Sequence, residues 1–263
     1  MIIVGITFLV FLFIECAYIY YYSRWKHLWA LESRIPPYKV THDVHEEVKV
    51  LLIGDSWAGI HHETGMDAYL NDLLESETKK PAVVTSKGKG GERIKGIYHL
   101  MFASDGYGTR TLLTEAPDYC VVFAGINDAA ANLGTRQYCY YYRLILDFLL
   151  VNHIRPVVVE IPDVNIWQIY GKKPVRDLMS DFVKSRMTEC RMYQFTKYRE
   201  ALYFMLLREN LMEKIVYVPM TDWNADSPNI DKSIFLDDQI HLNRQGYEKL
   251  DACIAKAIAR DLQ

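Results

Sequence analysis

Five short apolar runs, separated by longer amphipathic stretches, constrain the fold of this chain more than any other feature. The runs cover residues 48–54, 81–86, 118–125, 155–162 and 214–220. Their near-continuous apolar character is typical of strands buried on both faces. The helical segments are expected near 59–77, 92–103, 134–153, 174–210 and 244–261. Strands that alternate with helices predict an α/β fold, with one parallel sheet covered by helices on both faces.

The N-terminal segment, residues 2–22, is apolar apart from Glu15. At 1.5 Å per residue, a helix over this run would extend about 31 Å, close to the hydrocarbon thickness of a bilayer. Aromatic residues and the basic Arg24 and Lys26 follow it, as at a membrane interface. The run has no basic region ahead of it and no A-x-A-like cleavage site after it, so a cleaved signal peptide is the weaker alternative. We expect residues 1–29 to form a single-span transmembrane anchor with its interfacial segment.

The rest of the chain is interpreted as a linker and one catalytic domain. Residues 30–46 contain Pro36-Pro37 and mixed charges, which are typical of a linker. Residues 47–263 hold the alternating strands and helices. Two basic residues after the apolar run favour a cytoplasmic position for the domain, although so few charges leave the side of the membrane open.

Composition excludes several classes of protein. A net charge of -3 argues against a general nucleic-acid binder, which needs a basic face. The cysteines form no CxxC pair and no metal-ligand spacing, so the sequence suggests neither a disulfide framework nor a zinc site. An odd number of scattered cysteines favours a reducing compartment. The five residues are Cys16, Cys120, Cys139, Cys190 and Cys253.

Polar and glycine-rich stretches follow the expected strands or precede the last helix. They are Gly54-Asp55-Ser56, Gly88-Lys89-Gly90-Gly91, Gly125-Ile126-Asn127-Asp128 and Asp238-Gln239-Ile240-His241. Because parallel sheets bind ligands beyond the carboxyl ends of their strands, these stretches are candidates for one site.

In this order, the four stretches resemble the sequence blocks of the SGNH (GDSL) hydrolase family, from about residue 48 to residue 258. The resemblance implies a flavodoxin-like three-layer α/β/α sandwich with a five-stranded parallel sheet. It also implies an esterase, lipase, acyltransferase or carbohydrate O-deacetylase. Ser56 matches the family's nucleophile, and Asp238 and His241 match the pair that completes its triad. Gly91 and Asn127 match the family's oxyanion-binding glycine and asparagine.

The chemistry of these residue types agrees with the resemblance. A serine hydroxyl is a weak nucleophile until a base takes its proton, and His241 is the candidate base. Asp238, three residues earlier, can orient the imidazole. The Ser56 N–H, the Gly91 N–H and the Asn127 amide would stabilise the oxyanion. Two alternatives stay open, because Gly90 could replace Gly91 and Asp237 could compete with Asp238.

Several of these residues also have simpler interpretations. Ser56 could be only a helix N-cap, and Asp55 is expected to brace the turn. His61, His62 and Glu63 suggest a metal site, but adjacent histidines in a first helical turn point in different directions, so we expect a solvated start of a helix.

Other segments leave their roles open. Lys87, Lys89 and Arg93 could attract an anionic substrate or lie in a solvated loop, and "GKGG" lacks the GK[ST] ending of a phosphate-binding loop. The tyrosines of residues 138–143 are expected to pack a helix, with sugar stacking as an alternative. The stretch 163–214 is expected to hold an extra helix or a lid.

The sequence therefore predicts a membrane-anchored serine esterase that cleaves O-acyl esters of a small molecule or glycan through an acyl-Ser56 intermediate. We expect it to need no metal or cofactor. One alternative is an O-acyltransferase that uses the same acyl-enzyme to modify a polysaccharide. The other is a non-catalytic binding or scaffold protein with the same fold. The carbohydrate O-acetyl substrate rests on the family resemblance alone.

Overall fold

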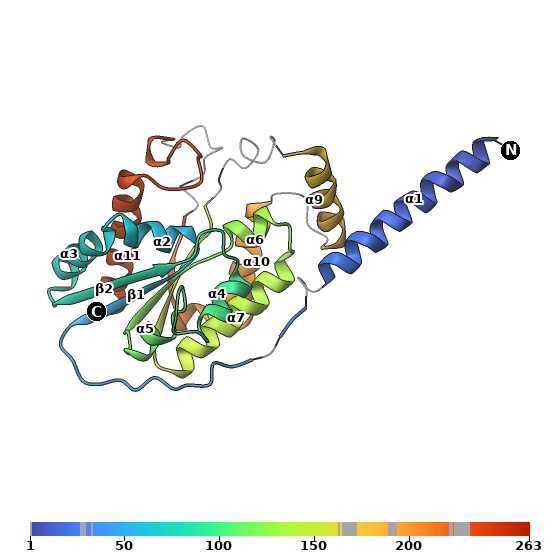
Figure 1. Cartoon of the computed structure of the whole chain (residues 1–263). Coiled ribbons are helices and arrows are strands. Elements are labelled where there is room, and N and C mark those ends of the chain that lie inside the picture. The colour runs from blue at the N-terminus through green and yellow to red at the C-terminus, as the bar shows by residue number, and fades with distance from the viewer. Residues whose placement is uncertain are drawn as a thin grey trace.

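The computed structural model contains a five-stranded, fully parallel sheet (Figure 1). It describes residues 2–26, 30–32, 34–162, 164, 173–188, 194–220, 223 and 232–263. The strands are β1 (Val48–Gly54), β2 (Ala82–Gly88), β3 (Tyr119–Phe123), β4 (Arg155–Val159) and β5 (Val216–Val218). The predicted α/β fold and its five strands are confirmed. The last three strands are shorter than their apolar runs.

The strand order is β2-β1-β3-β4-β5, so β1 lies between β2 and β3. The chain runs outward from β1 to β2 and then crosses back to β3. Adjacent strands whose connections leave in opposite directions form a topological switch point, where ligands of such sheets bind. The segments that follow β1 and β3 therefore meet at the carboxyl edge of the sheet.

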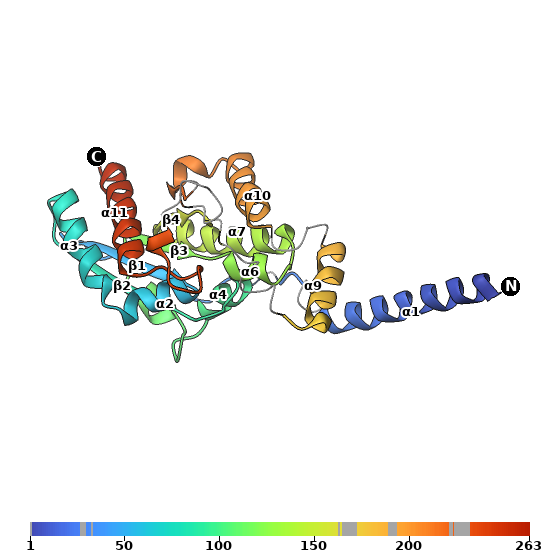
Figure 2. The same ribbon diagram turned by 90° about the horizontal axis from the view of Figure 1, so that it is seen from above.

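The helices of the domain pack in two groups on opposite faces of the sheet (Figures 1 and 2). One group contains α2 (Ser56–Glu63), α3 (Met66–Thr78) and α11 (Arg244–Asp261). The other contains α4 (Ile94–Leu100), α7 (Thr135–Val151) and α10 (Phe195–Arg208). The remaining elements are α1 (Ile2–Trp25), α5 (Arg110–Thr114), α6 (Ile126–Ala130), α9 (Val175–Met187) and the 3-10 turns Met212–Lys214 and Lys232–Ile234. The stretch 163–214 thus contributes two helices, α9 and α10, within its described part.

The core lies between the sheet and these helices, and the tyrosines of α7 help to build it. Tyr138, Tyr141 and Tyr142 are fully buried. The Tyr138 hydroxyl donates to the Ala124 carbonyl at 3.3 Å, and the Tyr142 hydroxyl donates to the Val122 carbonyl at 3.3 Å. These rings fill the core while their hydroxyls keep hydrogen bonds, which buried tyrosines require. Their burial supports the packing role and leaves these three rings unable to stack on a sugar.

Helix α1 projects away from the domain (Figure 1). Residues Ile3–Arg24 have a mean hydropathy of 2.2, and none of this stretch is buried. It is long and apolar enough to cross a membrane, and a signal sequence would pass the same test. The segment 34–46 has no helix or strand and is attached to the domain, because Tyr38 donates to the Met101 carbonyl and the Val40 N–H to Asn152.

Candidate active site

The turn between β1 and α2 presents Ser56 as the first residue of the helix. Asp55 is the N-cap, and its carboxylate accepts a hydrogen bond from the Trp57 N–H at 3.0 Å. A short acidic side chain at this position satisfies a helix N–H that has no intrahelical acceptor. Because Asp55 provides the cap, the interpretation of Ser56 as a mere N-cap is wrong. The half-buried Ser56 hydroxyl is left for another partner.

That partner is His241, from the loop that precedes α11. Its Nε2 atom lies 2.8 Å from the Ser56 Oγ atom. Its Nδ1 atom lies 2.5 Å from Oδ2 of Asp238. The other carboxylate oxygen of Asp238 accepts the backbone N–H groups of Ile240 and His241, each at 2.9 Å. These bonds run to Asp238, so the geometry favours it over Asp237 as the partner of the imidazole.

The charge state of Asp238 suits an anionic role. Partial burial raises the pKa of this carboxyl, but the two backbone N–H groups and the His241 ring outweigh it, and the net pKa lies below the usual value. Hydrogen bonds to the charged form are the cause. Asp238 is therefore ionised at neutral pH and can stabilise a positive charge on His241.

Asn127 lies at the same edge of the sheet, in α6 just after β3. Its Nδ2 atom donates to the Glu92 carbonyl at 2.9 Å and to Oδ2 of Asp55 at 3.2 Å. Gly91, next to Glu92 in the chain, occupies an exposed turn with φ +72°. The structure therefore brings Asn127 against the residue that precedes Ser56 and against the glycine-rich loop.

Two buried carboxyl groups lie behind this edge, and one of them was not singled out from the sequence. Asp55 and Asp128 are 2% and 1% exposed, and burial raises the pKa of each to about 7. Asp128 accepts the Ile94 N–H at 3.0 Å and so holds the start of α4. In the sequence, Asp128 is marked only by its position next to Asn127 in "GIND". Its burial depends on tertiary packing, which this short motif does not predict.

The residues that follow Ser56 in α2 differ from expectation. His62 and Glu63 are exposed, but they lie in the last turn of α2 and not at the start of a helix, because α2 begins at Ser56. His61 is fully buried, so the expectation for this residue was wrong. Its side chain points inward from α2 to α3, β2 and α11, whose polar groups replace water.

The structure also bears on the basic loop, on metal binding and on the cysteines, within the described part of the chain. Lys89 lies 2.7 Å from Glu92, so its charge is paired within the loop. No group of three His, Cys, Asp or Glu side chains there could hold a metal ion. Cys16, Cys120, Cys139 and Cys253 are free thiols, and Cys190 lies outside the described residues.

The chain is similar in sequence to a family of ester hydrolases. The model of the GDSL-like lipase/acylhydrolase family matches residues 52–249. No curated protein matches the chain.

Several solved structures share the fold. A GDSL-like lipase from Bacteroides thetaiotaomicron is 14% identical, with a TM-score of 0.55 over 81% of this chain and 89% of that one. A lipase/acylhydrolase from Enterococcus faecalis is 16% identical, with a TM-score of 0.55 over 81% and 96%. An acetyl-xylooligosaccharide esterase from Geobacillus is 16% identical, with a TM-score of 0.55 over 81% and 93%.

The raised pKa of Asp55 predicts a pH dependence of stability that Asp55→Asn weakens. The pKa of Asp55 is about 7 in the folded state against 3.8 as the ordinary value, so the folded chain binds a proton that the unfolded chain releases between these pH values. The free energy of unfolding therefore falls as pH rises from about 4 to about 7. In the Asp55→Asn variant this fall should be smaller.

Urea unfolding of the full-length chain in mild detergent at pH 5 and pH 7.5 measures the effect. Asp72→Asn, at an exposed position on α3, is the control and should keep the wild-type difference between the two pH values. An unchanged difference in Asp55→Asn would contradict the assignment.

Proposed function

Since the chain belongs to the GDSL-like lipase/acylhydrolase family, and is thus a hydrolase acting on ester bonds, we propose that Ser56, His241 and Asp238 are its catalytic triad. The observation that carries this proposal is the continuous chain of contacts from Ser56 Oγ to His241 Nε2, at 2.8 Å, and from His241 Nδ1 to Asp238, at 2.5 Å. Nucleophile, base and orienting carboxylate are recognised by such geometry rather than by sequence position.

In the proposed reaction the Ser56 oxygen attacks the ester carbonyl while His241 Nε2 takes the hydroxyl proton. Asp238 stabilises the imidazolium and keeps the Nδ1 proton in place. The tetrahedral intermediate collapses, the alcohol leaves with the proton from His241, and an acyl-Ser56 ester remains. Water, deprotonated by His241, then attacks the acyl group. The bond between the acyl carbon and Ser56 Oγ breaks, the acid is released, and His241 returns the proton to Ser56 Oγ.

We assign the oxyanion hole to the Ser56 N–H, the Gly91 N–H and the Asn127 amide. Ser56 N–H belongs to the first turn of α2, where helix N–H groups lack intrahelical acceptors and the helix dipole favours negative charge. Both amide hydrogens of Asn127 are engaged in this structure, by Asp55 at 3.2 Å and by the Glu92 carbonyl at 2.9 Å. These bonds hold the amide beside the Ser56 turn, and the longer one, to Asp55, is the one that would turn to the oxyanion when substrate binds. Loss of one such donor raises the barrier by about 3–4 kcal/mol.

The exposure of the triad favours hydrolysis over acyl transfer. The side chains of His241 and Asp238 are 27% and 42% exposed. A transferase must exclude water from its acyl-enzyme, whereas a hydrolase must admit it. We propose an O-acyl ester, with acetyl on a carbohydrate as the specific substrate class, which the name of the Geobacillus acetyl-xylooligosaccharide esterase supports.

We further propose that residues 1–29 anchor the protein, that residues 30–46 link the anchor to the domain, and that residues 47–263 form the catalytic domain. The apolar length of α1 supports the anchor, and its basic C-terminal flank favours the cytoplasmic face. Helix α9 gives further support. It packs at the C-terminal end of α1 (Figures 1 and 2), and it exposes apolar residues at helical spacing. These are Val175, Met179 and Phe182, which are 76%, 52% and 44% exposed.

Ser56→Ala should abolish hydrolysis of p-nitrophenyl acetate, because no acyl-enzyme can form. Removal of a catalytic serine of this kind costs on the order of a millionfold in turnover. Ser76→Ala, at an exposed serine of α3, is the control and should hydrolyse the ester at the wild-type rate. Release of p-nitrophenol followed at 405 nm (about the dye's absorbance maximum) measures both variants, and Ser56→Ala activity equal to that of the control would refute the proposed nucleophile.

The anchor predicts that the full-length chain stays in the membrane pellet after alkaline carbonate extraction. A single apolar span inserts effectively irreversibly, whereas a peripheral protein is released. The intact mass of the extracted protein serves as the control for processing. Release by carbonate, or a mass that lacks the N-terminal segment, would show that α1 is not an anchor.

A further inference from the structure

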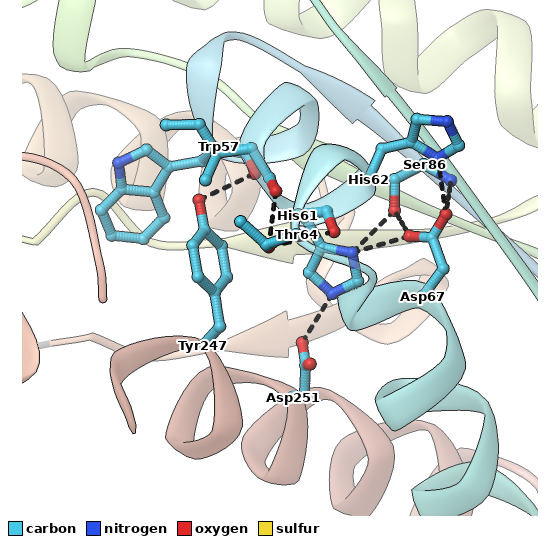
Figure 3. Close-up of polar contacts among 9 residues, drawn as sticks. Trp57, His61, His62, Thr64, Asp67, Ser86, Tyr247 and Asp251 are labelled. Carbon is cyan, nitrogen blue, oxygen red and sulfur yellow. Dashed lines mark hydrogen bonds and ion pairs between the residues drawn. The ribbon is translucent and has the colours of Figure 1, made fainter. Parts of the chain in front are cut away.

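His61 is a buried histidine that the proposed reaction does not use. It lies on α2, and its side chain is completely buried (Figure 3). Its Nε2 atom lies 3.0 Å from Oδ1 of Asp251 on α11, and its Nδ1 atom lies 2.8 Å from Oδ1 of Asp67 on α3. The Ser86 hydroxyl, on β2, also lies 2.8 Å from Nδ1. Four elements therefore meet at one imidazole.

The contacts indicate that His61 is an imidazolium. A neutral imidazole donates from only one ring nitrogen, whereas both nitrogens of His61 face carboxylates. Burial lowers the pKa of His61, but the hydrogen bonds to Asp251 and Asp67 outweigh it and raise the pKa to about 9. Burial raises the pKa of Asp67, but hydrogen bonds from His61, Ser86 and His62 outweigh it and lower the pKa to about 2.

The pKa of Asp251 shifts in the opposite direction to that of Asp67, because burial raises the pKa of this carboxyl more than His61 lowers it. Because two carboxylates face one ring, the proton of this cluster lies on His61. The other groups around His61 are the Tyr247 ring of α11, at 5.6 Å between centroids, and His62, which hydrogen-bonds the second oxygen of Asp67.

The cluster joins the helix of the nucleophile to the helix that follows the base. Ser56 is the first residue of α2, and α11 begins three residues after His241. A second link runs parallel to that of His61, because the Tyr247 hydroxyl donates to the Trp57 carbonyl at 3.1 Å (Figure 3). The relative position of α2 and α11 sets the distance between Ser56 and His241, so these links bear on that distance.

We propose that His61 is a positioning residue that, with Tyr247, holds α11 against α2 and so keeps the His241 imidazole within hydrogen-bond distance of Ser56. The proposal rests on the proposed triad and adds a residue to it that does not touch the substrate. A misplacement of reacting groups by about 1 Å can cost about a hundredfold in rate, so a small shift of α11 suffices.

The nature of the link supports positioning over mere stabilisation. A buried ion pair gains little net stability over well-packed apolar residues of similar volume, because both charges lose their hydration. Its geometry is directional, however, and an imidazolium between two carboxylates admits one arrangement of three helices. The second oxygen of Asp251 is buried and has no hydrogen-bond partner among the described residues, so His61 is the group that holds this carboxyl.

The test is Asp251→Asn, which keeps the shape of the side chain and removes its charge. We expect kcat for p-nitrophenyl acetate to fall about tenfold at pH 7.5, with KM within about twofold of wild type, since the reacting groups and not the binding surface are displaced. Loss of the His61 proton breaks one of its two hydrogen bonds to carboxylates, so kcat of the wild type should fall above about pH 9. In Asp251→Asn this alkaline fall should begin at lower pH, because His61 has lost a carboxylate that holds its proton. The acid limb of the pH profile should stay in place.

Ile254→Val, on the buried face of α11, is the matched control. It removes one buried methyl group, which lowers stability without touching either link. The melting temperature of each full-length variant compares the loss of stability, and kcat in the control should equal that of the wild type.

Tyr247→Phe keeps the test decisive if Asp251→Asn does not fold, because it removes only the second link. The proposal then requires a fall of several-fold in kcat with KM maintained. Unchanged kcat in the folded Asp251→Asn variant, or in Tyr247→Phe where Asp251→Asn is unfolded, would overturn it. Ser56→Ala separates this failure from that of the proposed function: an inactive Ser56→Ala beside a fully active Asp251→Asn removes only the positioning role.

Discussion

The contact between Ser56 Oγ and His241 Nε2, at 2.8 Å, joins residues 185 positions apart in the chain. Neither residue is close to the other until the sheet and α11 are formed. Strand β1 delivers Ser56 to the carboxyl edge of the sheet, and the connection from β5 to α11 returns His241 to the same edge. The parallel arrangement is therefore what allows an alcohol and an imidazole from opposite ends of the domain to meet. Every chemical role proposed for the site requires that meeting.

Around this contact the fold places charged groups where water is excluded. Asp55 caps α2 and accepts the Asn127 amide, so one buried carboxyl braces both the nucleophile turn and a candidate oxyanion donor. On the other side of α2, His61 joins carboxylates of α3 and α11. These groups lose hydration on burial, and directional hydrogen bonds replace it. The site thus combines an exposed imidazole, which water can reach, with a rigid polar support beneath it.

The strands and the family followed from the sequence because they depend on local pattern. Apolar runs mark buried strands, "GDS" lies at the end of the first of them, and "DQIH" precedes the last helix. The burial of His61 did not follow, since His61 and His62 are adjacent and chemically identical, and only the packing of α3 and α11 makes one buried and the other exposed. The same holds for Asp128, whose raised pKa arises from the elements that cover it. Sequence pattern gives the elements and the reactive residue types, whereas burial and charge state come from tertiary contacts.

The most direct measurement is peptide mapping by mass spectrometry after the full-length protein has reacted with a fluorophosphonate, which modifies activated serines. We predict one adduct, on the peptide that contains Ser56. The adduct should be lost in His241→Ala, because the hydroxyl is then no longer activated. An adduct on another serine, or equal modification of Ser56 in His241→Ala, would contradict the claim that these two side chains act together.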